Sequence, residues 1–328
     1  KAVLLNQGEK GTEAKLTELD ESSLPPGGVT VQVEYSSLNY KDALSAKGNR
    51  GVTRNYPHTP GIDAAGMVVA SDTPAIGPGD EVVVSGYDLG MNTAGGFGQY
   101  IRVPASWVMP RPKHLTAFQC MQIGTAGFSA AQAVDAIVSG GIAPSQGPIL
   151  VTGSTGGVGS FAVALLDHLG FNTTAVTGKA GEHAFLTGLG AKDFLDRKQA
   201  VRGKERMLLR ERWAGVVDSV GGEILATAIK STRYGGVVAS CGNAASGDLP
   251  LNVYPFILRA VRLIGIDSAE CPLERRQEIW NLLAGSWRVA LPPEMSVTVP
   301  LAEVGGWIER MLQGGVRGRI VIDLREDA

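Results

Sequence analysis

The sequence predicts an α/β protein with a parallel, doubly wound sheet in its middle and a β-rich segment before it. Three observations support this prediction. Six short apolar strands alternate with helical stretches between residues 148 and 267, a glycine-rich turn joins the first of them to a helix, and short strands with turn signals fill the first third of the chain. Right-handed crossovers place helices on both faces of such a sheet. At 328 residues the chain has the length of about two domains.

The composition excludes several classes of protein. Hydrophobic residues make up 44% and charged residues 19% of the chain, which is typical of a folded protein and not of a disordered one. Proteins that bind double-stranded DNA or RNA usually have an excess of basic residues. This chain has a net charge of -2, so no nucleic acid is expected as a partner. No apolar run reaches the roughly 18 residues of a membrane-spanning helix, so no membrane is expected either.

Cysteine usage and the first residues indicate a cytoplasmic protein. Cys120, Cys241 and Cys271 are too few and too far apart for a disulfide framework or a CxxC zinc pair. Sparse cysteines fit a reducing compartment. Residues 1–6 turn polar after a short apolar run and lack a cleavage site, so we interpret them as a first strand and not as a signal peptide.

The first third is expected to form a small, partly closed β-structure. Residues 29–35 alternate with period two, which is typical of a half-buried strand. Residues 66–70 and 80–84 are short apolar runs bounded by Gly, Pro and Asp, and residues 25–28 are strong turn formers.

A different pattern begins near Leu115. Residues 116–138 are expected to form a helix that the Gly-Thr-Ala-Gly segment 124–127 interrupts. The six strands of the parallel sheet are predicted at 148–152, 172–177, 191–196, 215–220, 236–240 and 262–267. The other predicted elements are helices at 156–169, 182–189, 274–283 and 302–312, and strands at 296–299 and 319–323.

The sharpest local signal is the glycine turn after the first of these six strands. Gly153, Gly156, Gly157 and Gly159 form a GxxGGxG pattern and not a strict GxGxxG fingerprint, because Ser154 occupies the position of the first glycine of that fingerprint. Such glycines let the backbone approach a pyrophosphate, and the following helix offers free N–H groups to its charge. The alternative is a tight strand–helix turn without a ligand. The candidate binding residues are Thr155, Gly156, Gly157, Val158 and Gly159.

The end of the second strand distinguishes between cofactors. A carboxylate about 20 residues past the glycine turn would bind a ribose hydroxyl and indicate NAD. Here the strand ends in Thr177, Gly178 and Lys179, and Arg197 follows the third strand, so cations can meet the 2′-phosphate of NADPH. Both cations could instead be ordinary solvated charges, and Glu182 weighs against NADPH.

Several stretches together resemble a known family. They are 36–43, 60–63, 123–128, 151–160, 234–236, 255–259 and 265–268. In these stretches the chain resembles the medium-chain dehydrogenase/reductases, and within them the zinc-free group similar to quinone oxidoreductases. The likeness is strongest to the NADPH-dependent acrylyl-CoA reductase branch and runs over nearly the whole chain.

This resemblance implies a fold and a set of site residues. It implies a GroES-like catalytic domain from 1–118 and 269–328, an inserted Rossmann domain at 119–268 that binds NADPH, and a homodimer. It also implies that Asn243 and Ile257 flank the nicotinamide half of the cofactor and that Arg319 contacts the cofactor. Ser268 is expected in the substrate cleft that proteins of this family have.

Residue types argue against a catalytic zinc, which needs three ligands of Cys, His or carboxylate type. Zinc members of the superfamily carry a Cys in the region that resembles 39–42 and a Gly-His-Glu where this chain has Gly61, Ile62 and Asp63. His58 is more simply a loop residue between prolines. We predict no metal, which makes alcohol oxidation by the zinc mechanism an unlikely activity.

The chemistry that remains is hydride delivery to an electron-poor carbon, such as the β-carbon of an α,β-unsaturated acyl-CoA. Tyr40 is the candidate at the nicotinamide end, with a half-buried structural role as its alternative, and Tyr87 is a weaker candidate for substrate contact. Lys47, Arg50 and Arg54 form a basic loop that could meet CoA phosphates or be merely solvated. Two other functions stay open: an NADPH:quinone oxidoreductase, and a non-catalytic NADPH-binding protein.

Overall fold

The computed structural model describes residues 1–8 and 11–325 and divides into two compact units. Unit 1 contains Lys1–Thr125, Ser268–Ala284 and Ser296–Ala328, and unit 2 contains Ala126–Asp267 and Gly285–Met295. Among the described residues, every helix is too short or too polar to span a lipid bilayer.

Unit 2 contains a six-stranded sheet in which every paired strand is parallel to its neighbour, in the order β10-β9-β8-β11-β12-β13. Its strands are β8 (Ile149–Val151), β9 (Thr173–Val176), β10 (Ala191–Leu195), β11 (Trp213–Asp218), β12 (Thr232–Ser240) and β13 (Arg262–Gly265). The order reverses between β8 and β11, as in a doubly wound dinucleotide-binding sheet. The predicted six-stranded parallel sheet is confirmed.

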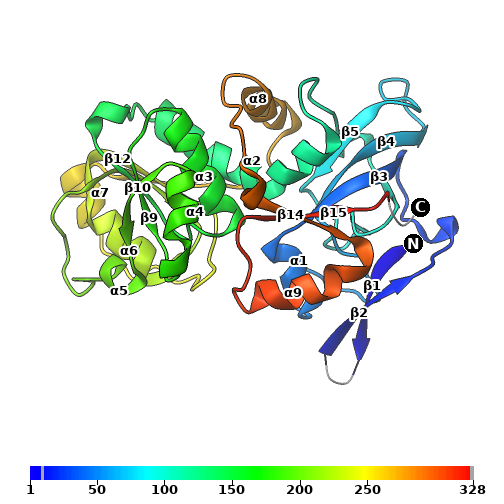
Figure 1. Ribbon diagram of the computed structural model, residues 1–328, viewed down its shortest axis with the longest axis horizontal. Helices are drawn as coiled ribbons and strands as arrows, with labels where there is room; N and C mark the ends of the chain where they lie inside the picture. Colours follow the sequence, from blue (N-terminus) through cyan, green and yellow to red (C-terminus); the bar gives the residue numbers. More distant parts are fainter. Residues whose placement is uncertain (9–10, 326–328) are drawn as a thin grey trace. The chain divides into compact units, whose positions relative to one another are not determined.

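Helices cover both faces of this sheet, with α3 and α4 on one side of the strands and α6 and α7 on the other (Figure 1). The helices and 3₁₀ turns of unit 2 are η3 (Pro144–Gln146), α3 (Gly157–His168), η4 (Ala180–Glu182), α4 (His183–Gly188), α5 (Arg197–Ala200), α6 (Gly222–Lys230), α7 (Tyr254–Arg259) and η5 (Pro293–Met295). Phe161, Leu165 and Leu166 of α3 are at most 1% exposed. Burial of each such side chain contributes about 1.5–3 kcal/mol, which holds α3 against the sheet.

Unit 1 contains a seven-stranded sheet in the order β14-β15-β3-β4-β5-β7, with β6 also paired to β3, and a separate β1-β2 pair. The strands are β1 (Ala2–Gly8), β2 (Gly11–Thr17), β3 (Val29–Leu38), β4 (Asp63–Ser71), β5 (Glu81–Ser85), β6 (Tyr100–Val103), β7 (Val108–Pro110), β14 (Ser296–Pro300) and β15 (Arg319–Asp323). The C-terminal strand β15 pairs directly with β3, so the two ends of the chain build one sheet.

Residues 29–35 form a strand within β3, as predicted, and their alternation largely holds. Val29, Val31, Val33 and Tyr35 are buried, whereas Gln32 is exposed and Glu34 is half-buried; Thr30 is also buried. β3 pairs with β4, β6 and β15. Val29 and Val31 are fully buried in the main hydrophobic core of unit 1, together with Ile101 of β6 and Ile322 of β15.

The helices around this sheet include one that the sequence analysis did not predict. The helices and 3₁₀ turns are η1 (Glu21–Ser23), α1 (Tyr40–Ala46), η2 (Ala105–Trp107), α2 (Ala117–Ser139), α8 (Leu273–Ala284), η6 (Leu301–Glu303) and α9 (Val304–Leu312). Helix α1 was not predicted, and it packs beside α9 (Figure 1). Strands β2, β6 and β7 were also not predicted, because each is short or lacks a clear apolar run.

The predicted interruption of α2 is confirmed at Gly124, whose φ of 49° and ψ of −162° break the helix. A Cβ at this position would lie 2.5 Å from Arg319 Nη2, 2.6 Å from Ser37 Oγ and 2.7 Å from Asp63 Oδ2. Glycine is therefore required twice, for the positive φ and for the space. The kink lets the start of α2 cross directly over a buried polar cluster.

Candidate functional site

The glycine turn lies between β8 and α3 in unit 2. Gly153 has a φ of 59°, and its carbonyl oxygen accepts the N–H of Gly156 at 3.0 Å. A Cβ on Gly159 would collide with the carbonyl oxygen of Gly153, so the first turn of α3 packs backbone to backbone on the turn. Glycine at 159 permits this close approach, and glycine at 153 permits the positive φ.

The N-terminus of α3 presents free backbone donors. The helix has 12 residues, and its N-cap, Gly156, provides no side-chain hydrogen bond. The N–H groups of Gly157, Val158 and Gly159 come too early in the helix to find an intrahelical acceptor. Together with the positive end of the helix dipole they form a binding site for an anion such as a diphosphate.

Ser154 and Thr155 are the two residues of the turn between Gly153 and Gly156. Ser154 is fully buried, donates from Oγ to the carbonyl oxygen of Val151 at 2.7 Å, and donates its N–H to the carbonyl oxygen of Val176 at 3.2 Å. The side chain thus stabilises the turn from within, which explains why a serine is tolerated here. Thr155 is 8% exposed.

The structure brings the predicted cation Arg197 onto the end of β9. Arg197 begins α5, where Asp196 caps the helix by accepting the N–H of Gln199 at 2.7 Å. A Cβ on Gly178 would lie 2.8 Å from Arg197 Nε, so the guanidinium stem packs across the glycine. Glycine at 178 therefore makes room for the arginine.

Lys179 and Thr177 lie at the same edge of the sheet. The backbone N–H of Lys179 donates to Thr177 Oγ1 at 3.1 Å, and Thr177 is 6% exposed. Glu182 ends the short turn η4, and its N–H donates to the carbonyl oxygen of Lys179. The edge of β9 therefore gathers a hydroxyl and two basic residues, with one carboxylate three residues further on.

The other predicted residues of unit 2 lie beyond β11. Asn243 is an exposed residue in the segment after β12, and its Cα would be 3.4 Å from a Cβ on Gly221. Ile257 is on α7 and is 68% exposed. Exposure of a large apolar side chain leaves Ile257 available for a contact, but identifies no ligand.

The predicted residues Tyr40 and Tyr87 belong to unit 1. Tyr40 is the first residue of α1 and is 44% exposed. The ring of Tyr87 stacks on Trp107, with 5.6 Å between ring centroids and 8° between ring planes. The guanidinium carbon of Arg276 lies 4.8 Å from the centroid of the Tyr87 ring, and the carbonyl oxygen of Ser268 accepts from Arg276 Nη2 at 3.0 Å. Packing within unit 1 therefore engages both Tyr87 and Ser268.

The structure places Arg319 inside a hydrogen-bond network of unit 1. The residue is 2% exposed. Its guanidinium donates from Nε to the carbonyl oxygen of Gln122 at 3.2 Å, from Nη1 to Asn39 Oδ1 at 3.1 Å, and from Nη2 to Ser37 Oγ at 2.8 Å. Nη2 is also 3.9 Å from Asp63 Oδ2. Three of the five N–H donors of this guanidinium are therefore used within unit 1.

Asp63 is the acceptor at the centre of this network. Its Oδ2 accepts from Ser37 Oγ at 2.6 Å, from Asn39 Nδ2 at 2.7 Å and from the N–H of Thr125 at 2.9 Å, and its Oδ1 accepts from Thr125 Oγ1 at 2.7 Å. The side chain is fully buried. A buried carboxylate is tolerated only when its oxygens are hydrogen-bonded in this way.

These contacts do not fit a catalytic zinc. Residues 39–42, where the resemblance places a Cys ligand, contain no Cys, and Ile62 replaces the His. Both oxygens of Asp63 already accept hydrogen bonds. Across residues 1–8 and 11–325, no group of three or more His, Cys, Asp and Glu side chains could hold a metal ion. His58 is buried, and its Nε2 lies 2.9 Å from the carbonyl oxygen of Gly90. Burial lowers the pKa of His58 below its usual range.

Asp42 is a residue that the sequence analysis missed. It accepts the N–H of Asn39 at 2.8 Å, of Gly61 at 3.1 Å and of Ile62 at 3.0 Å, and it is fully buried. Burial raises the pKa of this carboxyl to about 7, and the nearby Asp63 adds to the increase. The signal was available, because an Asn followed three residues later by an acid is a pattern of helix capping.

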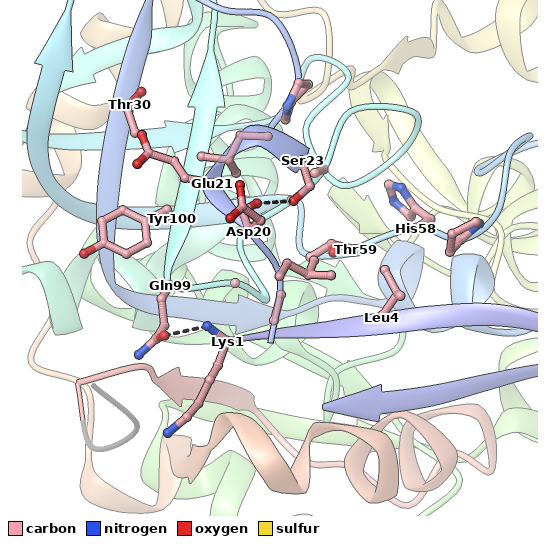
Figure 2. A pocket seen from close by; sticks show the side chains of 18 of the residues that line it. Lys1, Leu4, Asp20, Glu21, Ser23, Thr30, His58, Thr59, Gln99 and Tyr100 are labelled. Carbon is pink, nitrogen blue, oxygen red and sulfur yellow. Dashed lines mark hydrogen bonds between the residues drawn. The ribbon is translucent and has the colours of Figure 1, made fainter. Parts of the chain in front are cut away.

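A pocket of about 670 Å³ lies elsewhere in unit 1, along β1, η1 and β6 (Figure 2). Figure 2 shows Ser23 donating to the carbonyl oxygen of Asp20, at 2.6 Å. Glu21 in the pocket wall pairs with Arg102 at 3.1 Å. The pocket contains none of the predicted site residues, so we do not place a dinucleotide there.

A doubly wound parallel sheet with a glycine turn at its reversal point, joined to a separate β-rich unit, defines a dinucleotide-binding protein of the dehydrogenase type. Two family models match the chain: Alcohol dehydrogenase GroES-like domain over residues 25–113 and Zinc-binding dehydrogenase over residues 157–285. The chain belongs to the medium-chain dehydrogenase/reductase superfamily.

Similar proteins narrow the position within the superfamily. The chain is 42% identical to the probable acrylyl-CoA reductase AcuI of Escherichia coli, over 98% of both chains, and 42% identical to the acrylyl-CoA reductase AcuI of Ruegeria pomeroyi, again over 98% of both. It is also 39% identical to the putative quinone oxidoreductase YhfP of Bacillus subtilis, over 97% of this chain and 98% of the relative.

Two solved structures share the fold closely. The yhdH oxidoreductase of Salmonella enterica in complex with NADP has a TM-score of 0.95 at 41% identity and covers 99% of each chain. The Bacillus subtilis protein yhfP with NAD bound has a TM-score of 0.95 at 37% identity and covers 98% of each chain.

The raised pKa of Asp42 predicts a pH dependence of stability. A carboxyl whose pKa rises from 3.8 to about 7 on folding binds its proton more tightly in the folded state. Stability is therefore full below pH 4 and is lost as the pH rises through 7, by about 4 kcal/mol in total. Asp42→Asn has no proton to release, so its free energy of unfolding should lack this decline.

Urea unfolding of both proteins between pH 4 and pH 8 measures the effect. Asp72→Asn, which changes an exposed carboxylate of unit 1, is the matched control and should keep the wild-type profile. Parallel profiles for wild type and Asp42→Asn would contradict the assignment.

Proposed function

We propose that the chain is an NADPH-dependent reductase that delivers hydride to the β-carbon of a short α,β-unsaturated acyl-CoA, without zinc. The main support is the edge of unit 2, where the N–H groups at the start of α3 are available to a diphosphate and basic residues follow β9. The names of the acrylyl-CoA reductases that are 42% identical over 98% of the chain support the acceptor.

The proposed cofactor supplies the hydride, and the residues of the chain supply binding and geometry. Gly157, Val158 and Gly159 donate their N–H groups to the diphosphate, with Thr155 and Gly156 shaping the turn. Lys179 and Arg197 bind the 2′-phosphate beside Thr177 and Gly178; Asn243, Ile257 and Ser268 are the proposed neighbours of the nicotinamide half.

Tyr40 is the proposed catalytic contact in unit 1, where it packs near the ring or donates a hydrogen bond. Its exposed side chain at the start of α1 is consistent with this role. For Arg319 we favour an indirect role, because its donors already hold Asn39 and Ser37. Tyr87 stays the weaker candidate, because Trp107 and Arg276 already engage its ring.

The choice of cofactor has a direct test. Replacing Lys179 and Arg197 by Ala removes two charged donors to the 2′-phosphate. NADPH binding should weaken by about 2–4 kcal/mol, allowing for non-additivity, while NADH binding changes little. Isothermal titration calorimetry with both cofactors measures the difference.

Lys198→Ala removes the neighbouring exposed cation on α5 and serves as the control, with no expected selectivity between the two cofactors. An equal loss for NADPH and NADH in the double variant would refute the 2′-phosphate assignment. The NAD found in the structure of Bacillus subtilis yhfP makes this comparison informative.

The acceptor also has a competitor, since the Bacillus subtilis relative carries the name of a quinone oxidoreductase. The exposed residues Lys47, Arg50 and Arg54 favour a substrate that brings phosphates, as CoA does. We expect kcat/KM for acryloyl-CoA to exceed that for simple quinones by at least tenfold in steady-state assays with NADPH. A preference for quinones by orders of magnitude would overturn the choice.

A non-catalytic NADPH-binding protein is the second alternative. Intact NADPH binding without turnover of either acceptor class would favour it over both enzymes.

A homodimer and a cytoplasmic location complete the proposal. The edge strand β13 carries Leu263 at 37% exposure, and the neighbouring α7 carries Ile257 at 68% and Leu258 at 58%. An unpaired strand edge beside exposed apolar side chains suits a second copy of the chain. Sedimentation equilibrium should give twice the chain mass of 34.3 kDa, and a monomer would contradict the proposal.

A further inference from the structure

A buried carboxylate lies at the end of β11, close behind the glycine turn of unit 2. Asp218 is fully buried. Its Oδ1 accepts from Thr152 Oγ1 at 2.7 Å, and its Oδ2 accepts from the N–H of Gly221 at 2.9 Å and from Ser240 Oγ at 3.4 Å. Because these three partners follow or end β8, β11 and β12, one side chain connects the ends of three neighbouring strands.

A second layer of hydrogen bonds strengthens the connection. Thr152 Oγ1 accepts the N–H of Ser219 at 3.1 Å while it donates to Asp218, and Ser219 Oγ donates to the carbonyl oxygen of Thr152 at 3.2 Å. The N–H of Cys241 donates to the carbonyl oxygen of Asp218 at 2.9 Å. Thr152 thus has both its donor and its acceptor function used, and only a hydroxyl can serve both.

The loops that Asp218 joins also pack backbone to backbone. A Cβ on Gly153 would lie 2.6 Å from Ser219 Oγ, and a Cβ on Gly242 would lie 2.5 Å from the carbonyl oxygen of Ser219. A displaced Ser219 would therefore push on the glycine turn from one side and on the segment before Asn243 from the other.

The position of this cluster in the sheet indicates which half of a dinucleotide it serves. In a doubly wound sheet the ligand lies across the reversal point, with one mononucleotide on each side. The 2′-phosphate end belongs to β9 and β10, where Gly178 and Arg197 meet. The other half therefore faces the ends of β11 and β12, which are the ends that Asp218 holds.

We propose that Asp218, with Thr152, is a positioning residue for the nicotinamide half of the cofactor. The buried carboxylate fixes the 219–221 turn and the start of the segment after β12 relative to the glycine turn, so that the loops beneath the nicotinamide are ordered before the cofactor arrives. Preordered loops avoid an entropic cost on binding. The inference depends on the proposed NADPH binding and not on the acceptor.

Burial raises the pKa of Asp218 above its usual range, and the hydrogen bonds from Thr152, Gly221 and Ser240 partly oppose this increase. An Asn at this position has a single acceptor oxygen, so either the N–H of Gly221 or the hydroxyl of Thr152 would lose its acceptor.

The test compares whole-cofactor binding with binding of one half. Calorimetry measures Kd for NADPH and for 2′,5′-ADP, which contains the phosphorylated adenosine half and lacks the nicotinamide. Asp218→Asn and Thr152→Val should raise Kd for NADPH about tenfold, which is about 1.4 kcal/mol, and leave Kd for 2′,5′-ADP within about twofold. Thr152→Ser, which restores the hydroxyl, should recover the wild-type Kd for NADPH.

Thr232→Val is the matched control. Thr232 is fully buried, and its Oγ1 donates to the carbonyl oxygen of Ala228 at 2.9 Å, at the start of β12 and therefore at the opposite edge of the sheet. Removing this hydroxyl costs a comparable hydrogen bond, yet should leave both dissociation constants unchanged.

Two results would overturn the inference. One is an unchanged Kd for NADPH in the Asp218 and Thr152 variants, and the other is an equal loss for NADPH and 2′,5′-ADP, which indicates general destabilisation of unit 2. If Asp218→Asn does not fold, the Thr152→Val and Thr152→Ser pair decides. Failure of NADPH to bind the wild-type chain would instead refute the proposed function, so the two failures are distinguishable.

Discussion

The close backbone contact between Gly153 and Gly159 is the constraint on which the rest of unit 2 depends. Two residues without side chains let the first turn of α3 rest directly on the end of β8, so the free N–H groups of the helix point over the carboxyl edge of the sheet. A Cβ on Gly159 would collide with the carbonyl oxygen of Gly153 and push the helix away, whereas a Cβ on Gly153 would strain its positive φ and meet Ser219 Oγ at 2.6 Å. The anion-binding site is therefore a consequence of packing, without any charged side chain in the turn.

In unit 1 a network of buried hydrogen bonds, centred on two carboxyl groups, holds the central segments together. Where the resemblance to zinc enzymes would place metal ligands, this chain has Asn39, Ile62 and the buried acceptor Asp63. Asp63 and Asp42 each collect three or more donors from segments far apart in the chain. Buried carboxyl oxygens are costly to leave without donors, so the donors are held in one arrangement. The network gives unit 1 a buried polar centre in which the oxygens of both carboxyls accept hydrogen bonds.

The residues of the chain indicate the proposed cofactor more clearly than they indicate the hydride acceptor. The phosphates of a cofactor demand fixed charges and free N–H groups, which are visible as Lys179, Arg197 and the start of α3. An acceptor carbon demands only distance and orientation, which residue types encode poorly. This difference explains why relatives of about 40% identity bear the names of both acrylyl-CoA reductases and a quinone oxidoreductase.

The sequence by itself determined the features that depend on local pattern. Apolar runs and their spacing predicted the six parallel strands, glycine placement predicted the turn after β8, and the Gly-Thr-Ala-Gly segment predicted the break in α2. Each of these features arises from residues within a few positions of one another, where periodicity and backbone freedom dominate.

Only the tertiary structure decided the polar centre of unit 1, the connection made by Asp218 and the pairing of β3 with β4, β6 and β15. Asn39, Asp63, Thr125 and Arg319 are far apart in the sequence and meet only after β15 returns to pair with β3. A single sequence shows which residues can donate or accept hydrogen bonds. It does not show which of them the fold will bring within three ångströms, because those distances are set by long-range strand pairing.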